Sequence, residues 1–250
     1  MKQHDKVCIG IVNNGFIKSE LVLDLIQLRG IRDSCFVDFI QVGNIGQTTR
    51  NRNVVVQNFM ERTTADWLFM IDSDERLELE TWKRFLETAD FPHRKVVSGL
   101  VFADFEDEDG NKTPIPTIYS QTSNGLQAIH GYPSDQIIEV DAIGTGAVMV
   151  HRSVLQLMQD NATEHQGKDW AWFVEGAINQ TWYGEDILFS RKLKSLGVKI
   201  FAHTGAICAH YKHYWLDDRH HAHIREQAIQ QIQSESEVPL ASGSPITSKE

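Results

Sequence analysis

The feature that most constrains this chain is a short apolar run that ends in two carboxylates. Residues 67–71 are all apolar, and Asp72 and Asp74 follow directly with Ser73 between them. A run of this length between polar residues is typical of a strand buried on both faces. Open α/β sheets bind ligands beyond the carboxyl ends of their strands, so both carboxylates are expected at a ligand-binding edge. Two oxygen ligands there suit Mg²⁺ or Mn²⁺ on a diphosphate, and a solvated acidic turn is the simpler alternative.

The elements around this run predict an α/β fold. Strands are expected at residues 7–12 and 36–42, and helices at residues 19–30, 50–63 and 77–89. This alternation implies parallel strands joined by right-handed crossovers. There is no G-x-G-x-x-G after the first strand and no G-x-x-x-x-G-K-[ST] in the chain, which argues against a Rossmann dehydrogenase and against a P-loop enzyme.

The second half of the chain is expected to be less regular. A strand is predicted at 96–104, a polar insertion with little periodicity at 105–136, and one or two strands at 137–150. A short helix (153–159), an aromatic-rich loop (164–183), a helix (184–196) and strands at 198–202 and 206–209 are expected to follow. We predict a single domain over residues 1–230 and a flexible tail or linker over residues 231–250.

Composition and charge narrow the classes of partner. With 41% apolar and 23% charged residues, the 250-residue chain can bury a substantial core. A formal net charge of −10 argues against nucleic-acid binding, which needs a clustered basic surface. Cys8, Cys35 and Cys208 are odd in number and lie in apolar runs, so buried free thiols are expected. No apolar stretch has the length of a signal peptide or a membrane span, which favours a cytoplasmic protein.

Three further motifs lie where a ligand site would need them. Arg52-Asn53 opens a predicted helix, where the N-terminus and a guanidinium suit the polar groups of a nucleotide; an ordinary exposed pair is the alternative. Glu185-Asp186 opens a later helix directly after Trp182-Tyr183. A carboxylate beside aromatic walls could act as a general base, whereas acidic residues also favour a first helical turn because they oppose the dipole. Gly144-Thr145-Gly146 would let a sugar approach the backbone or would simply bend a strand.

Basic residues near the end of the chain supply the remaining candidates. His210 follows an apolar segment and could complete the coordination of Mn²⁺, although a lone histidine after a strand is more often structural. Lys212 and His213 could reach a diphosphate. A C-terminal helix is expected to carry three more histidines on its exposed face, namely His220, His221 and His223.

The candidate motifs follow one another in a recognisable order. They are the strand that ends at Asn13, Arg52-Asn53, Asp72-Ser73-Asp74, Gly144-x-Gly146, Glu185-Asp186 and His210. In this order and spacing, over residues 6–213, the sequence resembles the GT-A glycosyltransferases, most closely the family 2-type group and its small soluble bacteriophage-encoded members. The resemblance implies the GT-A fold, a Rossmann-like α/β domain with a mostly parallel central sheet flanked by helices and a small antiparallel portion on the acceptor side.

The resemblance also implies a role for each matching residue. The residues that it places around a nucleotide-sugar are Asn13, Arg52, Asn53, Asp72, Ser73, Gly144 and Gly146. The ligands that it implies for Mn²⁺ or Mg²⁺ are Asp72, Asp74 and His210. It also places Asp186 beside the acceptor as the base, with Glu185 orienting the acceptor. Lys212 is the expected contact to the diphosphate. A UDP-sugar is the expected donor, although residues 42–49 contain no carboxylate of the kind that reads uracil in many relatives, which leaves the base open.

The predicted function is therefore metal-dependent transfer of a sugar from a nucleoside-diphosphate sugar to a hydroxyl group of a protein, glycan or small molecule. A carboxylate base suits a single in-line displacement with inversion, and retention stays open. The alternatives are a sugar-nucleotide nucleotidyltransferase, a non-catalytic carbohydrate-binding module and a glycosyltransferase that acts on hydroxymethylated DNA. If the chain is phage-encoded, the host cytoplasm is its expected location.

Overall fold

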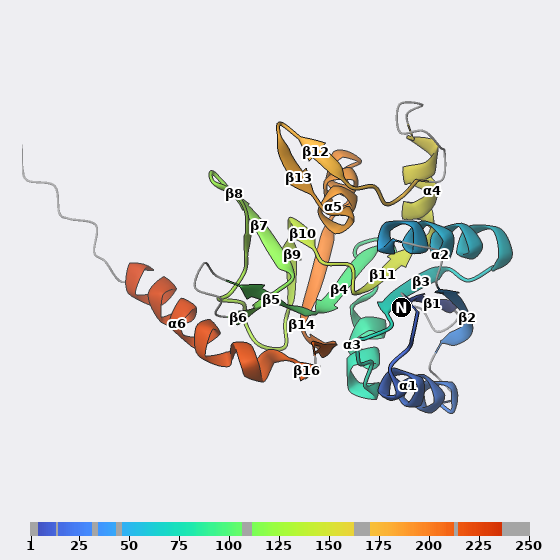
Figure 1. Ribbon diagram of the computed structural model, residues 1–250, viewed down its shortest axis with the longest axis horizontal. Helices are drawn as coiled ribbons and strands as arrows, with labels where there is room; N and C mark the ends of the chain where they lie inside the picture. The colour runs from blue at the N-terminus through green and yellow to red at the C-terminus, as the bar shows by residue number, and fades with distance from the viewer. Residues whose placement is uncertain are drawn as a thin grey trace, which may run out of the picture.

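The structure is a computed structural model, and it describes residues 5–13, 15–31, 35–43, 47–106, 112–162, 171–212 and 215–236. These residues form a layered α/β molecule in which helices cover both faces of a central sheet (Figure 1). The α/β fold class predicted from the alternation of strands and helices is confirmed.

The central sheet has seven strands in the order β2-β1-β3-β11-β4-β14-β9. Its strands are β1 (Val7–Asn13), β2 (Phe36–Gly43), β3 (Trp67–Asp72), β4 (Val96–Leu100), β9 (Ile137–Val140), β11 (Ala147–His151) and β14 (Ile200–Ile207). Pairing is parallel between β1 and β2, β1 and β3, and β4 and β14, whereas β11 and β9 run antiparallel to their neighbours. The sheet is therefore mixed, and β11 joins the first three strands to the rest.

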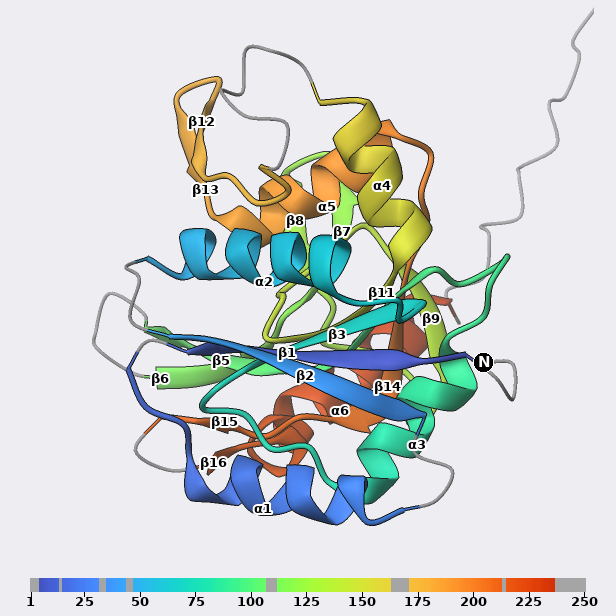
Figure 2. The same ribbon diagram turned by 90° about the vertical axis from the view of Figure 1, so that its right-hand side faces the viewer.

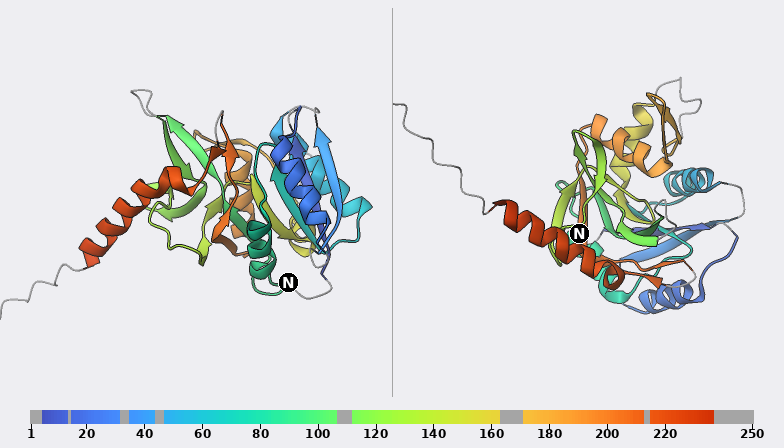
Figure 3. Two further views of the ribbon diagram at one scale, coloured as in Figure 1. Left: turned by 90° about the horizontal axis from the view of Figure 1, so that it is seen from below. Right: turned by 60° about the vertical axis from the view of Figure 1, so that its left-hand side comes forward.

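The helices divide between the two faces of this sheet. Helices α2 (Thr48–Arg62), α4 (Arg152–Asp160) and α5 (Glu185–Ser195) cover one face, and α1 (Ser19–Arg29) and α3 (Leu79–Thr88) cover the other (Figure 2). Helix α6 (Asp218–Ser236) packs against the β6 region and extends away from the body of the molecule (Figures 1 and 3). No helix in these described ranges combines the length and hydrophobicity that crossing a membrane requires.

The strand β3 shows why the core has two parts. Leu68 and Met70 pack on the α2 side with residues such as Phe59, whereas Trp67, Phe69 and Ile71 pack on the other side with Trp82 and Phe85. All five residues from 67 to 71 are 0% exposed. Successive side chains of a strand point to opposite faces, so only a strand covered on both faces buries such a continuous apolar run. The prediction for this segment is confirmed.

The region expected to be an irregular insertion contains antiparallel strands instead. Strand β5 (Phe102–Glu106) pairs with β6 (Lys112–Pro116), and β7 (Ile118–Thr122) pairs with both β8 (Gly125–Ala128) and β10 (Ala142–Ile143). The expectation of an irregular insertion over 105–136 is wrong. The strands there are short and mostly only partly buried, so no long apolar run marks them in the sequence. The strand predicted at 96–104 is likewise divided between β4 and β5.

Two other predicted boundaries change in the structure. The strands expected at 198–202 and 206–209 are the single strand β14, and the aromatic-rich segment contains a hairpin of β12 (Gly176–Ile178) and β13 (Thr181–Tyr183). The short pair β15 (His210–Tyr211) and β16 (Trp215–Leu216) follows β14. Helix α6 continues to Ser236, and residues 237–250 of the predicted tail lie outside the described residues.

Helix α6 also corrects the prediction for its histidines. His221 is 0% exposed, with its Nε2 3.0 Å from Nδ1 of His130 and its Nδ1 3.3 Å from the hydroxyl of Tyr132. The ring of His221 stacks on that of His130 and on that of Tyr132. The prediction of an exposed histidine face is thus wrong for His221, because the sequence of an isolated helix does not show which face another segment covers. His223 is exposed as predicted.

Candidate functional site

A polar cavity of about 260 Å³ lies at the carboxyl ends of β1 and β3. It is lined by Val12, Phe16, Thr48, Asp72, Ser73, Asp74, His210 and Lys212. Every polar residue of this lining except Thr48 is a candidate from the sequence, although His210 comes 136 residues after Asp74. The predicted position of the site, at the edge of the sheet where parallel strands end, therefore matches a real cavity.

Backbone hydrogen bonds fix the turn that carries the carboxylates. The amide of Ser73 donates to the carbonyl of Val12 at 2.9 Å, and the amide of Tyr211 donates to the carbonyl of Asp74 at 2.9 Å. The amide of Glu75 closes the turn by donating to the carbonyl of Asp72 at 3.2 Å. Because the turn is attached to β1 on one side and to β15 on the other, the side chains on it start from a rigid backbone.

His210 faces the Asp74 carboxylate across the cavity. Its Nε2 lies 3.3 Å from Oδ2 of Asp74, while its Nδ1 lies 2.9 Å from the carbonyl oxygen of Phe102. A carbonyl can only accept, so Nδ1 donates to Phe102 and Nε2 is the nitrogen directed at Asp74. Burial opposes a charge on this ring, but Glu75 and Asp74 raise the pKa of His210 to about 9. Although burial also opposes its ionisation, the hydrogen bond from His210 lowers the pKa of Asp74.

Glu75 is the residue of this site that the sequence analysis missed. Its side chain is 0% exposed, and neither carboxylate oxygen has a hydrogen-bond partner. Oε1 lies 3.8 Å from Nδ1 of His210, and burial raises the pKa of Glu75 to about 8. The available signal was the third acidic residue of the Asp72–Glu75 run, but nothing in the sequence shows that this carboxylate turns inward.

The donor set of this cluster fits a hard divalent cation. Asp74, Glu75 and His210 each offer one ligand atom, and these atoms all lie within 4.8 Å of one another. Carboxylate oxygens with one imidazole are ligands that Mn²⁺ accepts, and Mg²⁺ accepts the oxygens. The unpartnered oxygens of Glu75 are the specific sign that a positive charge belongs here, because a buried carboxylate without a partner is costly.

Asp72, also predicted as a metal ligand, lies in the same cavity with a different partner. Its Oδ2 accepts a hydrogen bond from Nη2 of Arg52 at 2.9 Å, whereas its Oδ1 is buried and has no partner. Burial raises the pKa of Asp72 against the opposing effect of Arg52. The structure therefore groups Asp74 with His210 as predicted and places Asp72 at the wall of the cavity, with one oxygen committed to Arg52.

The Arg52 guanidinium joins three segments of the chain. Besides Asp72, it donates from Nε to Oε1 of Glu185 at 3.2 Å and from Nη1 to the carbonyl of Thr145 at 2.9 Å. The side chain is only 4% exposed. Burial opposes its charge, but Asp72 and Glu185 raise the pKa of Arg52 above its ordinary value. Arg52 is thus held by protein groups instead of being open to a nucleotide base.

Glu185 and Asp186 occupy the first turn of α5, as predicted. The helix starts after Gly184, whose extended backbone makes it the N-cap residue, and acidic groups there oppose the helix dipole. Asp186 is partly buried, and burial followed by the charge of Glu185 raises its pKa. Burial, with a smaller contribution from Asp186, also raises the pKa of Tyr119 to about 12. A carboxylate with a raised pKa is chemically suited to accept a proton.

Asn13 and Asn53 lie close to the cavity but are occupied with the backbone. Asn13, the last residue of β1, is 4% exposed and its Oδ1 accepts from the amide of Gly15 at 2.6 Å. Asn53 donates to the carbonyl of Phe173 at 2.7 Å and accepts from the amide of Phe173 at 3.0 Å. Both residues therefore fix the segments around the site, and neither lines the cavity itself.

The two predicted glycines give room to protein side chains. A Cβ on Gly144 would lie 2.6 Å from Cβ of Thr117, and a Cβ on Gly146 would lie 2.9 Å from Oε1 of Glu75. The carbonyl of Gly146 also accepts from the amide of Asp72 at 2.8 Å. Other groups do approach the backbone closely at this motif, as expected, but they are the side chains of Thr117 and Glu75.

The aromatic-rich segment divides between core and surface. Trp172 and Phe173 are buried, whereas Trp182 on β13 is 67% exposed. Trp170, in the aromatic-rich segment, and the candidate His213 lie outside the described residues.

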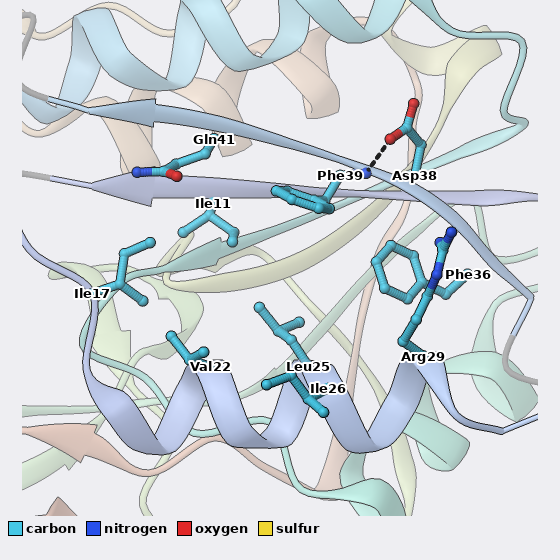
Figure 4. A pocket seen from close by; sticks show the side chains of 10 residues that line it. All are labelled: Ile11, Ile17, Val22, Leu25, Ile26, Arg29, Phe36, Asp38, Phe39 and Gln41. Atoms are coloured by element: carbon cyan, nitrogen blue, oxygen red, sulfur yellow. Dashed lines mark hydrogen bonds between the residues drawn. The ribbon is translucent and has the colours of Figure 1, made fainter.

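A larger groove of about 410 Å³ lies elsewhere, between α1 and the edge strand β2 (Figure 4). Val22, Leu25 and Ile26 of α1 point toward Phe36 and Phe39 of β2. Arg29 lies over the ring of Phe36, and Asp38 turns away to accept from the amide of Phe39. Among the described residues, no group of metal-ligating side chains converges in this groove. The polar cavity is therefore the candidate functional site.

Comparison with known proteins supports the fold. Searches with protein-family models and against curated proteins return no match to this sequence. Among solved structures, A197 from STIV is similar, with a TM-score of 0.54 and 15% identity over 82% of this chain and 85% of that chain. GalNAc-T7, solved with UDP, GalNAc and Mn²⁺, is similar with a TM-score of 0.53 and 11% identity over 81% of this chain. This chain spans 43% of the length of GalNAc-T7. These similarities confirm a fold of the GT-A type.

Proposed function

We propose that this chain is a metal-dependent glycosyltransferase that moves a sugar from a nucleoside diphosphate to a hydroxyl group. The observation that supports this best is the cavity at the ends of β1 and β3, where Asp72, Asp74, His210 and Lys212 meet on a GT-A type sheet. Metal ligands together with the ammonium group of Lys212 suit a diphosphate, which carries several negative charges, better than a neutral sugar. UDP is the proposed carrier because GalNAc-T7, of similar fold, was solved with UDP and Mn²⁺.

On the donor side, the proposed metal ligands are Asp74 and His210, with the buried Glu75 beside them. A divalent cation bound there would neutralise the diphosphate and stabilise it as a leaving group. Lys212 is exposed at the cavity and is the proposed second positive charge for the phosphates. Asp72 keeps Oδ1 without a partner, so we assign it to the same ion or to a sugar hydroxyl.

On the acceptor side, Asp186 is the proposed general base and Glu185 its orienting neighbour. Asp186 sits at the start of α5, and its raised pKa makes its carboxylate a stronger base toward a hydroxyl group. The proposed acceptor is a hydroxyl of a protein, a glycan or a small molecule in the cytoplasm. The exposed Trp182, only four residues before Asp186, offers an apolar face for such a ligand.

The alternatives differ in what they would consume and release. A sugar-nucleotide nucleotidyltransferase would release pyrophosphate, and a carbohydrate-binding module would bind sugar without regard to metal. Transfer to hydroxymethylated DNA is disfavoured by the net charge of −10. No observation on the cavity favours any of the three over donor cleavage.

The direct test is slow hydrolysis of the donor. The protein is incubated with Mn²⁺ and a panel of nucleotide-sugars, and the released nucleoside diphosphate is measured with and without chelator. We expect release of one diphosphate, dependent on metal and lost in Asp74→Asn and His210→Ala, with Glu87→Gln, an exposed carboxylate on α3, as the unchanged control. Absence of any metal-dependent release or binding across the panel would refute the proposal.

A further inference from the structure

We infer that Arg52 is a positioning residue that couples the diphosphate side of the site to the acceptor side. This inference rests on the proposed function, since it concerns how the two halves of that site communicate. It assigns to Arg52 a role different from contact with the nucleoside.

The inference starts from the three hydrogen bonds of the guanidinium. Nη2 binds Asp72 in the wall of the cavity, and Nε binds Glu185, which precedes the proposed base and does not line the cavity. Nη1 binds the carbonyl of Thr145, between the two glycines that pack on Thr117 and Glu75. One rigid, planar group thus connects Asp72 with Glu185, which lies 133 positions after Arg52 in the sequence.

Burial makes this connection stiff. The Arg52 side chain is 4% exposed, Asp72 is 23% exposed and Glu185 is 18% exposed. Ion pairs shielded from water are weakened little by salt, and a planar fork holds two carboxylates at a fixed mutual angle. The flexible ammonium of lysine supplies the same charge but cannot fix that angle.

The connection also determines how Asp72 meets a ligand. Arg52 occupies Oδ2, which leaves Oδ1 as the oxygen without a partner. A ligand that binds Oδ1 and shifts the Asp72 carboxylate therefore also shifts the guanidinium of Arg52. The guanidinium in turn shifts the side chain of Glu185, the residue before Asp186. Conversely, removing the charge of Glu185 lets Arg52 bind Asp72 more tightly and makes Asp72 less available to the donor.

The test measures the affinity for UDP in the presence of Mn²⁺ by calorimetry, so that it does not depend on turnover. Glu185→Gln is compared with its parent in two backgrounds, wild type and Arg52→Lys. In the wild-type background we expect Glu185→Gln to weaken binding by about fivefold or more, as residues in one hydrogen-bonded network do. In the Arg52→Lys background the same substitution should change the affinity by less than about twofold.

A matched control separates coupling from general damage. Arg152 is another partly buried arginine, but its guanidinium donates only to groups at the end of α2 and to the carbonyl of Ala65. In an Arg152→Lys background, Glu185→Gln should have its full wild-type effect. Thermal unfolding of each variant checks that it is folded. If Arg52→Lys does not fold, Asp72→Asn, Glu185→Gln and the double variant are compared in the wild-type background instead. If the fold-changes in UDP affinity of the two single variants multiply in the double variant, the coupling is contradicted.

The outcomes distinguish this inference from the proposed function. If the wild type binds no nucleoside diphosphate in a panel that includes UDP, both are refuted. If it binds but Glu185→Gln has no effect, or has the same effect in the Arg52→Lys background, only the coupling is refuted, because a purely long-range charge effect would persist with lysine at position 52.

Discussion

Glu75 has the least usual environment of the residues around the cavity. A fully buried carboxylate with neither oxygen hydrogen-bonded is expensive unless a positive charge is near, and here the nearest one is the ring of His210 at 3.8 Å. The same contact places Glu75 behind the imidazole nitrogen that faces away from Asp74. The carbonyl of Phe102 orients the ring through its hydrogen bond with that nitrogen, so Glu75 acts on His210 through its charge, which favours a cation at the site.

The substitution Glu75→Gln tests this role. It keeps the shape of the side chain and removes its ability to ionise and bind a cation, and no side-chain hydrogen bond of Glu75 is lost. We expect the free energy of unfolding of the metal-free protein to be unchanged or higher, and the affinity for Mn²⁺ to fall by about 10- to 100-fold. Chemical denaturation and calorimetric titration with Mn²⁺ measure the two quantities. Glu78→Gln, at an exposed neighbour, is the control, and equal Mn²⁺ affinity in both variants would remove Glu75 from the site.

Asp186 is the second residue with a distinct expectation. Because it lies on α5 and does not line the cavity, Asp186→Asn should leave the affinity for UDP with Mn²⁺ within about twofold of the wild type, while transfer to an acceptor falls by about 100-fold or more. Steady-state kinetics and calorimetry measure the two effects. Asp160→Asn, on the exposed end of α4, controls for loss of a carboxylate. Full transfer by Asp186→Asn would assign the base to another group.

Among the elements, helix α6 depends most on one buried histidine. His221 fixes the helix to the segment that carries His130 and Tyr132, with Arg225 nearby on the same helix. Burial, followed by the proximity of His130 and Arg225, lowers the pKa of His221 from 6.5 to about 4. Burial also lowers the pKa of His130. Protonation of His221 is thus disfavoured while α6 stays in place.

The sign of the resulting pH dependence follows directly. Between pH 6.5 and about 4 the unfolded chain binds a proton at position 221 that the folded chain excludes, so stability falls as the pH decreases through this range. The loss from this group amounts to at most about 3 kcal/mol. In His221→Gln, unfolding monitored from pH 7 to 4 should show a shallower decline than in the wild type. His223→Gln, an exposed substitution on α6, should decline like the wild type, and parallel curves for all three proteins would contradict this account.

The elements also show what a local pattern can and cannot reveal. The helix of residues 19–29 was predicted almost to its ends, because leucine spacing and Gly30 mark it locally. Strand β3 was predicted because a strand covered on both faces needs a continuous apolar run. The strands β6, β7 and β8 are short and mostly only partly buried, so their sequences resemble a polar loop. Their structure depends on the partners that pair with them.

At the scale of the whole molecule, the order of the sheet decides how the two halves of the site meet. Strand β11, which follows the glycine motif, lies between β3 and β4, and β14 brings His210 back to the turn after β3. The proposed ligands Asp74 and His210, from the first and last thirds of the sequence, therefore follow two strands of the same sheet, β3 and β14. Such an arrangement predicts that the site and the core unfold together.

Unfolding should accordingly occur in one cooperative transition for the described domain. Mn²⁺ with UDP at about 100 times the dissociation constant should stabilise the folded state by about 2.7 kcal/mol, and Asp74→Asn should lose this shift. Differential scanning calorimetry with and without the two ligands measures it, and UDP without metal is the control. Two separate transitions, with only one shifted by ligand, would mean that the cavity belongs to a subdomain that unfolds independently.

The sequence by itself determined the α/β class, the buried strand before the acidic turn and the edge of the sheet where Asp72, Asp74 and His210 would meet. These conclusions follow from local properties, since a doubly covered strand and a strand-end carboxylate leave a mark within a few residues. Only the tertiary structure decided that Glu75 turns inward, that Arg52 is bound between Asp72 and Glu185, and that His221 is buried. Each depends on a contact between residues that are far apart in the sequence, such as 133 positions for Arg52 with Glu185 and 91 positions for His130 with His221. No local pattern carries that information.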